Sequence, residues 1–250
     1  MSRLNWQRSA AVFALLMVSA GLRAELQIEI TSGVDKAVPI AVVPFGWSGT
    51  GAQPPQDAAA IVAADLARSG RFAPMDRKDM LQRPTTGIEV KFSDWKIQGS
   101  DYLVIGRVVQ AGGGDQFEIQ FQVFDVLRGE QLLGYRQATN AADFRRNSHR
   151  VADLIYEKLT GVRGVFSTRI AYVTVSGPAA KRTFRLLVTD ADGENPRIML
   201  ETAQPVMSPA WSPDGRRIAY VSFENNRSEI YVQDLRSGAR KRVSARPGVN

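Results

Sequence analysis

A short stretch near the end of the chain predicts a β-hairpin, and part of it occurs twice. Residues 208–221 read Ser-Pro-Ala-Trp-Ser-Pro-Asp-Gly-Arg-Arg-Ile-Ala-Tyr-Val. Ser212, Pro213 and Gly215 fall at the first, second and fourth positions of a type I turn, where each residue type is favoured. The last five letters also stand at 169–173, 48 positions earlier, and a second apolar strand follows each copy. Such a repeat of short strands and turns predicts the blades of a β-propeller.

The repeat also predicts a structural role for its aromatic residue. The residues that define it are Pro209, Trp211, Pro213, Asp214 and Gly215. An aromatic side chain at a fixed position of every blade is favoured between adjacent sheets, where its large ring area is buried. We therefore expect Trp211 to pack between blades, in preference to the alternative of a platform for a ligand.

The first 24 residues have the pattern of a separate N-terminal segment. Arg3 and Arg8 make a basic start, residues 10–20 are an eleven-residue apolar run with a single Ser, and Ala24 is a small residue at a cleavage position. This pattern is typical of a secretory signal peptide, and the run is shorter than the roughly 20 residues that span a bilayer. An uncleaved amphipathic anchor is the alternative. Cleavage predicts a mature chain that starts at Glu25, lies in the periplasm and does not insert into a membrane.

Composition narrows the classes of function. The sequence contains no Cys, which excludes disulfides, thiol nucleophiles and Cys-based metal sites. Without Arg3, Arg8 and Arg23 the chain carries 29 basic and 25 acidic residues, so the mature surface is only mildly basic. Basic residues cluster over 236–246 without interleaved aromatics, which is typical of a solvated strand and not of a nucleic-acid site.

Between the signal peptide and the repeat, the pattern predicts one α/β domain. Expected strands lie at 26–30, 38–45, 72–75, 102–110, 117–126 and 131–138, and expected helices at 56–69, 92–97 and 141–159. The run 38–45 is nearly all apolar, as in a strand covered on both faces. The three strands after 102 form a meander. Asn140 is a candidate cap for the last helix and Gly161 a candidate end.

These elements divide the chain into three parts. We expect a signal peptide over 1–24, an α/β domain with a mixed sheet and two main helices over 25–162, and the start of an all-β propeller over 163–250. About two blades are present, whereas about three repeats are needed for stability, so the chain is expected to be the N-terminal part of a longer protein.

No catalytic constellation is evident. His149, the only histidine, falls beside Arg145 on the polar flank of the last helix, which predicts a surface role and excludes a multi-His zinc site. Residues 46–51, Gly-Trp-Ser-Gly-Thr-Gly, fail the nucleophile-elbow and dinucleotide patterns and are expected to form a loop. Residues 190–194 look like a calcium loop but lack its later ligands, so a turn between strands is expected. We expect no cofactor and no metal.

Several stretches together resemble a known family. Besides the repeat at 208–215, they are Ser-Gly-Val-Asp at 32–35, Pro-Ile-Ala-Val-Val-Pro-Phe at 39–45 and the strand at 169–173. The chain resembles the TolB family of Tol-Pal β-propeller proteins from about Glu25 to its end. The resemblance implies a six-bladed ring when complete, whose first blade takes its missing strand from the C-terminus. It also implies a non-enzymatic periplasmic scaffold that maintains outer-membrane integrity and draws the outer membrane inward during division.

The resemblance also implies partners and their sites. TolA would bind the mature N-terminal segment, which consists of Glu25, Leu26, Gln27, Ile28, Glu29, Ile30 and Thr31. Pal, the peptidoglycan-associated lipoprotein, would bind the propeller. Other outer-membrane proteins and colicins are further expected partners, whereas nucleic acid is not. The candidate Pal-facing residues lie where loops precede inner strands: Gln204, Pro205, Met207, Arg246 and Asn250.

One alternative function shares the repeat. Exported hydrolases related to prolyl oligopeptidase and tricorn also carry such a propeller, and they need a nucleophile elbow in a second domain. The sequence beyond Asn250 separates the two hypotheses. Roughly 170–180 further residues of blade repeats favour the scaffold, whereas about 250 residues with an elbow favour the hydrolase.

Overall fold

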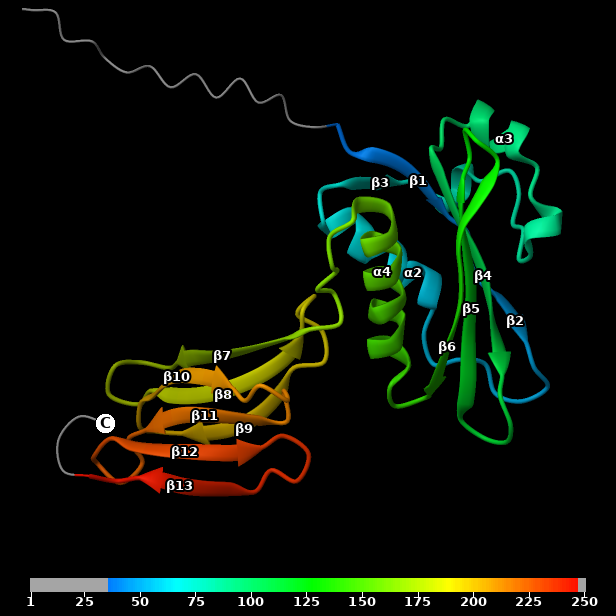
Figure 1. The fold of residues 1–250 in the computed structure, drawn as a ribbon. Helices are drawn as coiled ribbons and strands as arrows, with labels where there is room; N and C mark the ends of the chain where they lie inside the picture. The colour runs from blue at the N-terminus through cyan, green and yellow to red at the C-terminus, as the bar shows by residue number, and fades with distance from the viewer. Residues whose placement is uncertain (1–35, 247–250) are drawn as a thin grey trace, which may run out of the picture. The chain divides into compact units, whose positions relative to one another are not determined.

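The computed structural model describes residues 36–246, and Figure 1 shows their fold. The first part is a six-stranded sheet in the order β3-β1-β4-β5-β6, with β2 paired to β4. The strands are β1 (Val38–Val42), β2 (Gly46–Ser48), β3 (Phe72–Pro74), β4 (Tyr102–Gln110), β5 (Gln116–Asp125) and β6 (Glu130–Asn140). Pairs β1–β3, β1–β4 and β2–β4 are parallel, and β4–β5–β6 are antiparallel. The predicted mixed sheet is confirmed.

Helices cover both faces of this sheet. Helices α2 (Ala58–Arg68) and α4 (Phe144–Thr160) contribute to the core on one face, around Phe121 and Val104. The short α3 (Phe92–Ile97) contributes the buried Trp95 to a smaller core on the other face. Two 3₁₀ turns, η1 (Arg77–Asp79) and η2 (Gly87–Glu89), lie before α3 in the chain. Strand β1 is covered on both faces, which explains why its residues are almost all apolar.

Helix ends follow local rules, with one correction. The side chain of Asp57 caps α2 by accepting from the Ala60 N–H, and Gly161 ends α4 in the left-handed conformation at φ 73°. Asn140 was expected to cap the last helix, and this prediction is wrong. Asn140 is the last residue of β6, and its side chain accepts instead from the N–H of Asp143, which occupies the cap position.

The segment 46–51 also differs from expectation. It was predicted to be a loop, but Gly46–Ser48 forms β2, which pairs in parallel with β4 opposite Arg107, Val108 and Val109. Glycine and serine weaken any single-sequence strand signal. The second half of β4 supplies the hydrogen-bonding partner, which lies 61 residues away in the chain.

From β7 onward the described chain is strand and turn. One sheet holds β7 (Arg169–Ser176), β8 (Thr183–Asp190) and β9 (Arg197–Thr202). The next holds β10 (Val206–Trp211), β11 (Arg217–Ser222), β12 (Glu229–Asp234) and β13 (Arg240–Ser244). All pairs in both sheets are antiparallel. The two copies of the repeated pentapeptide begin β7 and β11, so the predicted all-β propeller part is confirmed.

The hairpin turn forms as its sequence predicts. The Gly215 N–H donates to the Ser212 carbonyl at 2.9 Å, and the Ser212 hydroxyl bonds both Asp214 and the backbone of Arg217. Gly215 has φ 65°, a conformation that favours glycine. The residue types of the repeat are therefore explained by the turn itself.

Trp211 lies between the two sheets. It packs against a core that includes Leu186 of β8 and Ile218 of β11. The Arg169 guanidinium lies 5.0 Å from the centre of the indole ring, and its Nη2 donates to the Gly215 carbonyl. The structure thus agrees with the expected packing between blades.

A buried carboxylate stabilises the second sheet. Glu229 is 1% exposed, and its oxygens accept hydrogen bonds from Asn225 at 2.7 Å, Tyr231 at 2.8 Å, Arg227 at 2.9 Å and Arg242 at 3.0 Å. The bonds from Asn225 and Tyr231, with the two guanidinium groups, lower the pKa of Glu229 from 4.5 to about 2, although burial opposes this.

This site predicts a loss of stability in acid. Because the folded pKa of Glu229 is depressed, its contribution is complete above pH 4.5 and is lost as the pH falls toward about 2. We expect Glu229→Gln to lower the unfolding midpoint in urea clearly at about pH 6 and much less at about pH 3. If the unfolding midpoints of the wild type and Glu229→Gln differ equally at both pH values, the depressed pKa of Glu229 is contradicted.

Among residues 36–246, no helix is long and apolar enough to cross a membrane. The exact domain boundaries stay a prediction.

Candidate functional site

Two predicted binding regions lie partly or wholly outside the described residues. The N-terminal segment expected to bind TolA, residues 25–31, precedes residue 36, and Asn250 follows residue 246. Their roles stay predictions.

The remaining candidate Pal-facing residues are placed at the ends of strands of the second sheet, with one correction. Gln204 and Pro205 precede β10, and Arg246 follows β13. Met207 was expected in a loop, but it lies within β10 and pairs with Val221. The strand starts earlier than expected because a bulge follows Met207, where Ser208 takes φ 55° and lets Pro209 be accommodated. Met207 is nevertheless 45% exposed.

The only histidine is buried, which corrects the predicted surface role. His149 lies in α4 and is 1% exposed. Its Nδ1 lies 2.6 Å from Oδ2 of Asp65 in α2, a carboxylate that is itself fully buried. Arg68 donates to the other oxygen of Asp65 at 2.7 Å. The flank of α4 that looks polar in projection therefore faces α2, because the two helices pack against each other.

The other side of the imidazole faces the turn between β8 and β9. His149 Nε2 lies 3.6 Å from Oδ2 of Asp192 and has no hydrogen-bond partner among residues 36–246. Arg145, one helical turn before His149, bonds the same oxygen of Asp192, and its Nε lies 3.7 Å from Asp190. Three carboxylates, one imidazole and one guanidinium thus meet in a nearly enclosed cluster.

The expected turn at 190–194 is confirmed. The Gly193 N–H donates to the Asp190 carbonyl at 3.0 Å, and Gly193 takes φ 87°. Burial raises the pKa of Asp192, but the Glu194 N–H and the Arg145 guanidinium outweigh it and lower that pKa overall. The sequence signal for this cluster was present in the Asp-x-Asp spacing. The sequence gives no sign that these carboxylates lie near His149, because 41 residues separate His149 from Asp190.

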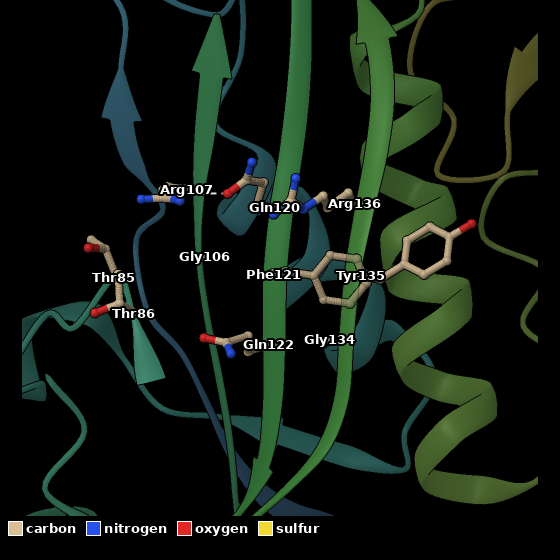
Figure 2. A pocket seen from close by; sticks show the side chains of 10 residues that line it. All are labelled: Thr85, Thr86, Gly106, Arg107, Gln120, Phe121, Gln122, Gly134, Tyr135 and Arg136. Carbon is tan, nitrogen blue, oxygen red and sulfur yellow. Dashed lines mark hydrogen bonds between the residues drawn. The ribbon is translucent and has the colours of Figure 1, made fainter. Parts of the chain in front are cut away.

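A polar groove on the sheet was missed from the sequence. Arg107, Gln120 and Arg136 stand opposite one another on β4, β5 and β6, as Figure 2 shows, and Arg107 Nε donates to Gln120 Oε1 at 2.8 Å. With Gln122 and the loop residue Thr86 they line a groove of about 490 Å³.

The groove lies on the face of the sheet that α3 covers only in part. Along β5, Glu118, Gln120 and Gln122 alternate with buried apolar residues, and this period of two was the available signal. Guanidinium, amide and hydroxyl groups favour hydrogen bonding with a polar or anionic surface. They do not supply a nucleophile paired with a base.

The described residues hold no arrangement suited to nucleophilic catalysis around the histidine. His149 contacts carboxylates on both ring nitrogens, and its Nε2 bonds no serine within residues 36–246. Ser48, the serine of the segment compared with a nucleophile elbow, lies in β2 and not at a strand-to-helix turn.

Comparison with known proteins agrees with this architecture. The TolB amino-terminal domain family matches residues 26–132, and the TolB beta propeller domain family matches residues 156–250. Tol-Pal system protein TolB of Thioalkalivibrio sulfidiphilus is 52% identical over 96% of this chain and 54% of its own length. The same protein of Nitrosococcus oceani is 48% identical over 96% of this chain and 55% of its own length.

A solved structure shows the same fold. The crystal structure of TolB from Acinetobacter baumannii matches with a TM-score of 0.73 and 39% identity, over 86% of this chain and 51% of that one. The chain thus spans about half the length of the relatives it matches. Since both domain families match in order, and the fold agrees with a solved member, the chain belongs to the TolB family of Tol-Pal system proteins.

Proposed function

We propose that this chain belongs to a periplasmic scaffold of the Tol-Pal system that performs no catalysis. In this proposal it binds Pal through its propeller and TolA through the N-terminal segment. The system would maintain outer-membrane integrity and draw the outer membrane inward during division, and colicins would exploit the same propeller. The single observation that supports this proposal is the order of the two TolB domains along one chain, an α/β domain followed by propeller sheets.

The physical properties of the two parts suit two separate partners. A propeller is a rigid surface, so the scaffold loses little conformational freedom when a partner binds to it. An alternating apolar segment such as Leu26, Ile28 and Ile30 can add as a strand to the sheet of a partner. One chain can thereby connect two proteins.

Calorimetry on the purified mature protein tests the proposal directly. We expect saturable binding of soluble Pal and of the periplasmic domain of TolA, each with one site. A mature protein that melts cooperatively yet binds neither partner would overturn the proposed scaffold.

The proposed location carries its own prediction. Because a basic start, a short apolar run and Ala24 precede residue 25, we expect the exported protein to begin at Glu25. N-terminal sequencing of protein released from the periplasm checks this. Full-length protein that retains Met1 and sediments with membranes would contradict it and favour the uncleaved anchor.

A further inference from the structure

The unpartnered nitrogen of His149 requires a physical explanation. Its other nitrogen, Nδ1, lies 2.6 Å from the carboxylate of Asp65, so Nδ1 is the donor in that contact and a neutral ring has its lone pair on Nε2. That lone pair faces Oδ2 of Asp192 at 3.6 Å in a buried place. Two electron-rich atoms this close repel each other where water is excluded. A positive centre between them would remove the repulsion.

The distance distinguishes between two such centres. A proton on Nε2 would make a charge-assisted hydrogen bond to Asp192, which draws N and O to about 2.7–2.9 Å. Two ligands on one tetrahedral zinc ion, with bonds of about 2.0–2.2 Å, stand about 3.3–3.5 Å apart. The observed 3.6 Å is close to the second spacing and too long for the first.

The surrounding groups complete a coordination set. Ligand atoms of His149, Asp190 and Asp192 all lie within 4.8 Å of one another. Asp65 on Nδ1 corresponds to the carboxylate that orients a metal-bound histidine from behind. Asp65, Asp190 and Asp192 carry three negative charges, of which Arg68 compensates the one on Asp65 and Arg145 compensates one of the other two. One negative charge remains, and a cation bound between Nε2 and these oxygens neutralises it.

We propose that His149 Nε2, Asp190 and Asp192 bind one divalent cation of the zinc type, with a fourth position open to water. The ion ties helix α4 to the turn between β8 and β9, so it stabilises the contact between the α/β part and the first propeller sheet. Arg145 bonds Asp192 and lies near Asp190, so its guanidinium competes with the ion for these oxygens. Removing that charge is therefore expected to strengthen metal binding.

The sequence makes the test unusually clean. With one histidine and no cysteine among these 250 residues, no second imidazole or thiolate of this sequence can bind zinc, and the His149→Gln variant distinguishes this site from any other in the mature protein. The experiment is isothermal titration of zinc chloride into the tag-free mature protein near neutral pH, with the melting temperature measured with and without zinc. We expect one ion per chain to bind below about 0.1 mM, with a matching rise in melting temperature.

Three variants locate the site. His149→Gln keeps a donor toward Asp65 but loses the imidazole, and it should weaken zinc binding by more than the roughly 10- to 100-fold that loss of an outer-shell partner costs. Arg145→Gln should strengthen binding about fivefold, because a nearby positive charge is removed. Asp143→Asn is the matched control, an exposed carboxylate beside the same helix that pairs with Arg146. It should leave zinc binding unchanged.

Nitrogen NMR of the labelled imidazole gives a readout independent of stability. The proposal predicts a neutral ring protonated on Nδ1, whose Nε2 resonance moves when zinc is added. An imidazolium at neutral pH that does not respond to zinc would overturn it, and so would a His149→Gln protein that binds zinc as tightly as the wild type. If His149→Gln fails to fold, the decision rests on Arg145→Gln, where unchanged or weaker binding overturns the proposal.

Discussion

Deletion of residues 25–31 from the mature protein should abolish TolA binding, by at least about 100-fold, and leave Pal affinity and the melting temperature unchanged. The reason lies in the chain on either side of the deletion. Leu26, Ile28 and Ile30 alternate with polar residues, so an added strand would carry all three on one face, whereas the first described strand, β1, begins at Val38. The removed residues are therefore separated in sequence from the buried strand that supports the sheet.

Matched substitutions identify the face that binds. Serine at Leu26, Ile28 and Ile30 should reproduce the deletion, whereas serine at Gln27 and Glu29 should have little effect, because alternate residues of a strand point to opposite faces. Calorimetry with both partners and a melting curve on each protein are the measurements. A clear drop in melting temperature, or unchanged TolA affinity, would show that the segment is an ordinary structural strand.

The second large effect is expected at Trp211. Trp211→Ala removes a ring that packs against the core cluster containing Leu186 and Ile218, which come from two different sheets, and also removes the partner of Arg169. We expect unfolding to become easier by about 3 kcal/mol, at the lower end of Trp truncations because the ring is only partly buried. Urea denaturation of the complete mature protein measures it.

Two further variants separate packing from direct contact. Trp211→Phe keeps an aromatic ring between the sheets and should recover most of the stability, while Arg169→Gln should cost only the cation–π share, about 0.5–1 kcal/mol. Pal affinity measured on the folded fraction should be unchanged in all three proteins. Loss of Pal binding in a protein that unfolds like the wild type would instead make the indole a contact residue.

Local patterns were sufficient where one element and its own turn decide the structure. The run Ser212–Gly215 formed its turn, β4 and α3 have the expected bounds, and Gly161 ends α4. In each case the physical cause acts over a few residues: a hydrogen bond across the turn, a period of two, or a left-handed glycine.

Distant partners decided what the patterns missed. Gly46–Ser48 forms a strand because it pairs with β4. Met207 belongs to β10 because the bulge after it allows Met207 to pair with Val221. The polar groove around Gln120 needed three strands in register before its side chains could face one another. A single-sequence pattern carries no information about which strand arrives alongside.

His149 illustrates the division most clearly. The sequence by itself determined that these 250 residues contain a repeat of propeller type, a leading α/β domain and no cysteine, because composition and periodicity are properties of the chain. Helical periodicity placed His149 away from the apolar stripe of α4, and that is correct for the helix alone. Only the tertiary structure decided that α2 and the turn after β8 close over that flank with their own carboxylates, because burial of a polar face depends on contacts made by residues far apart in the chain.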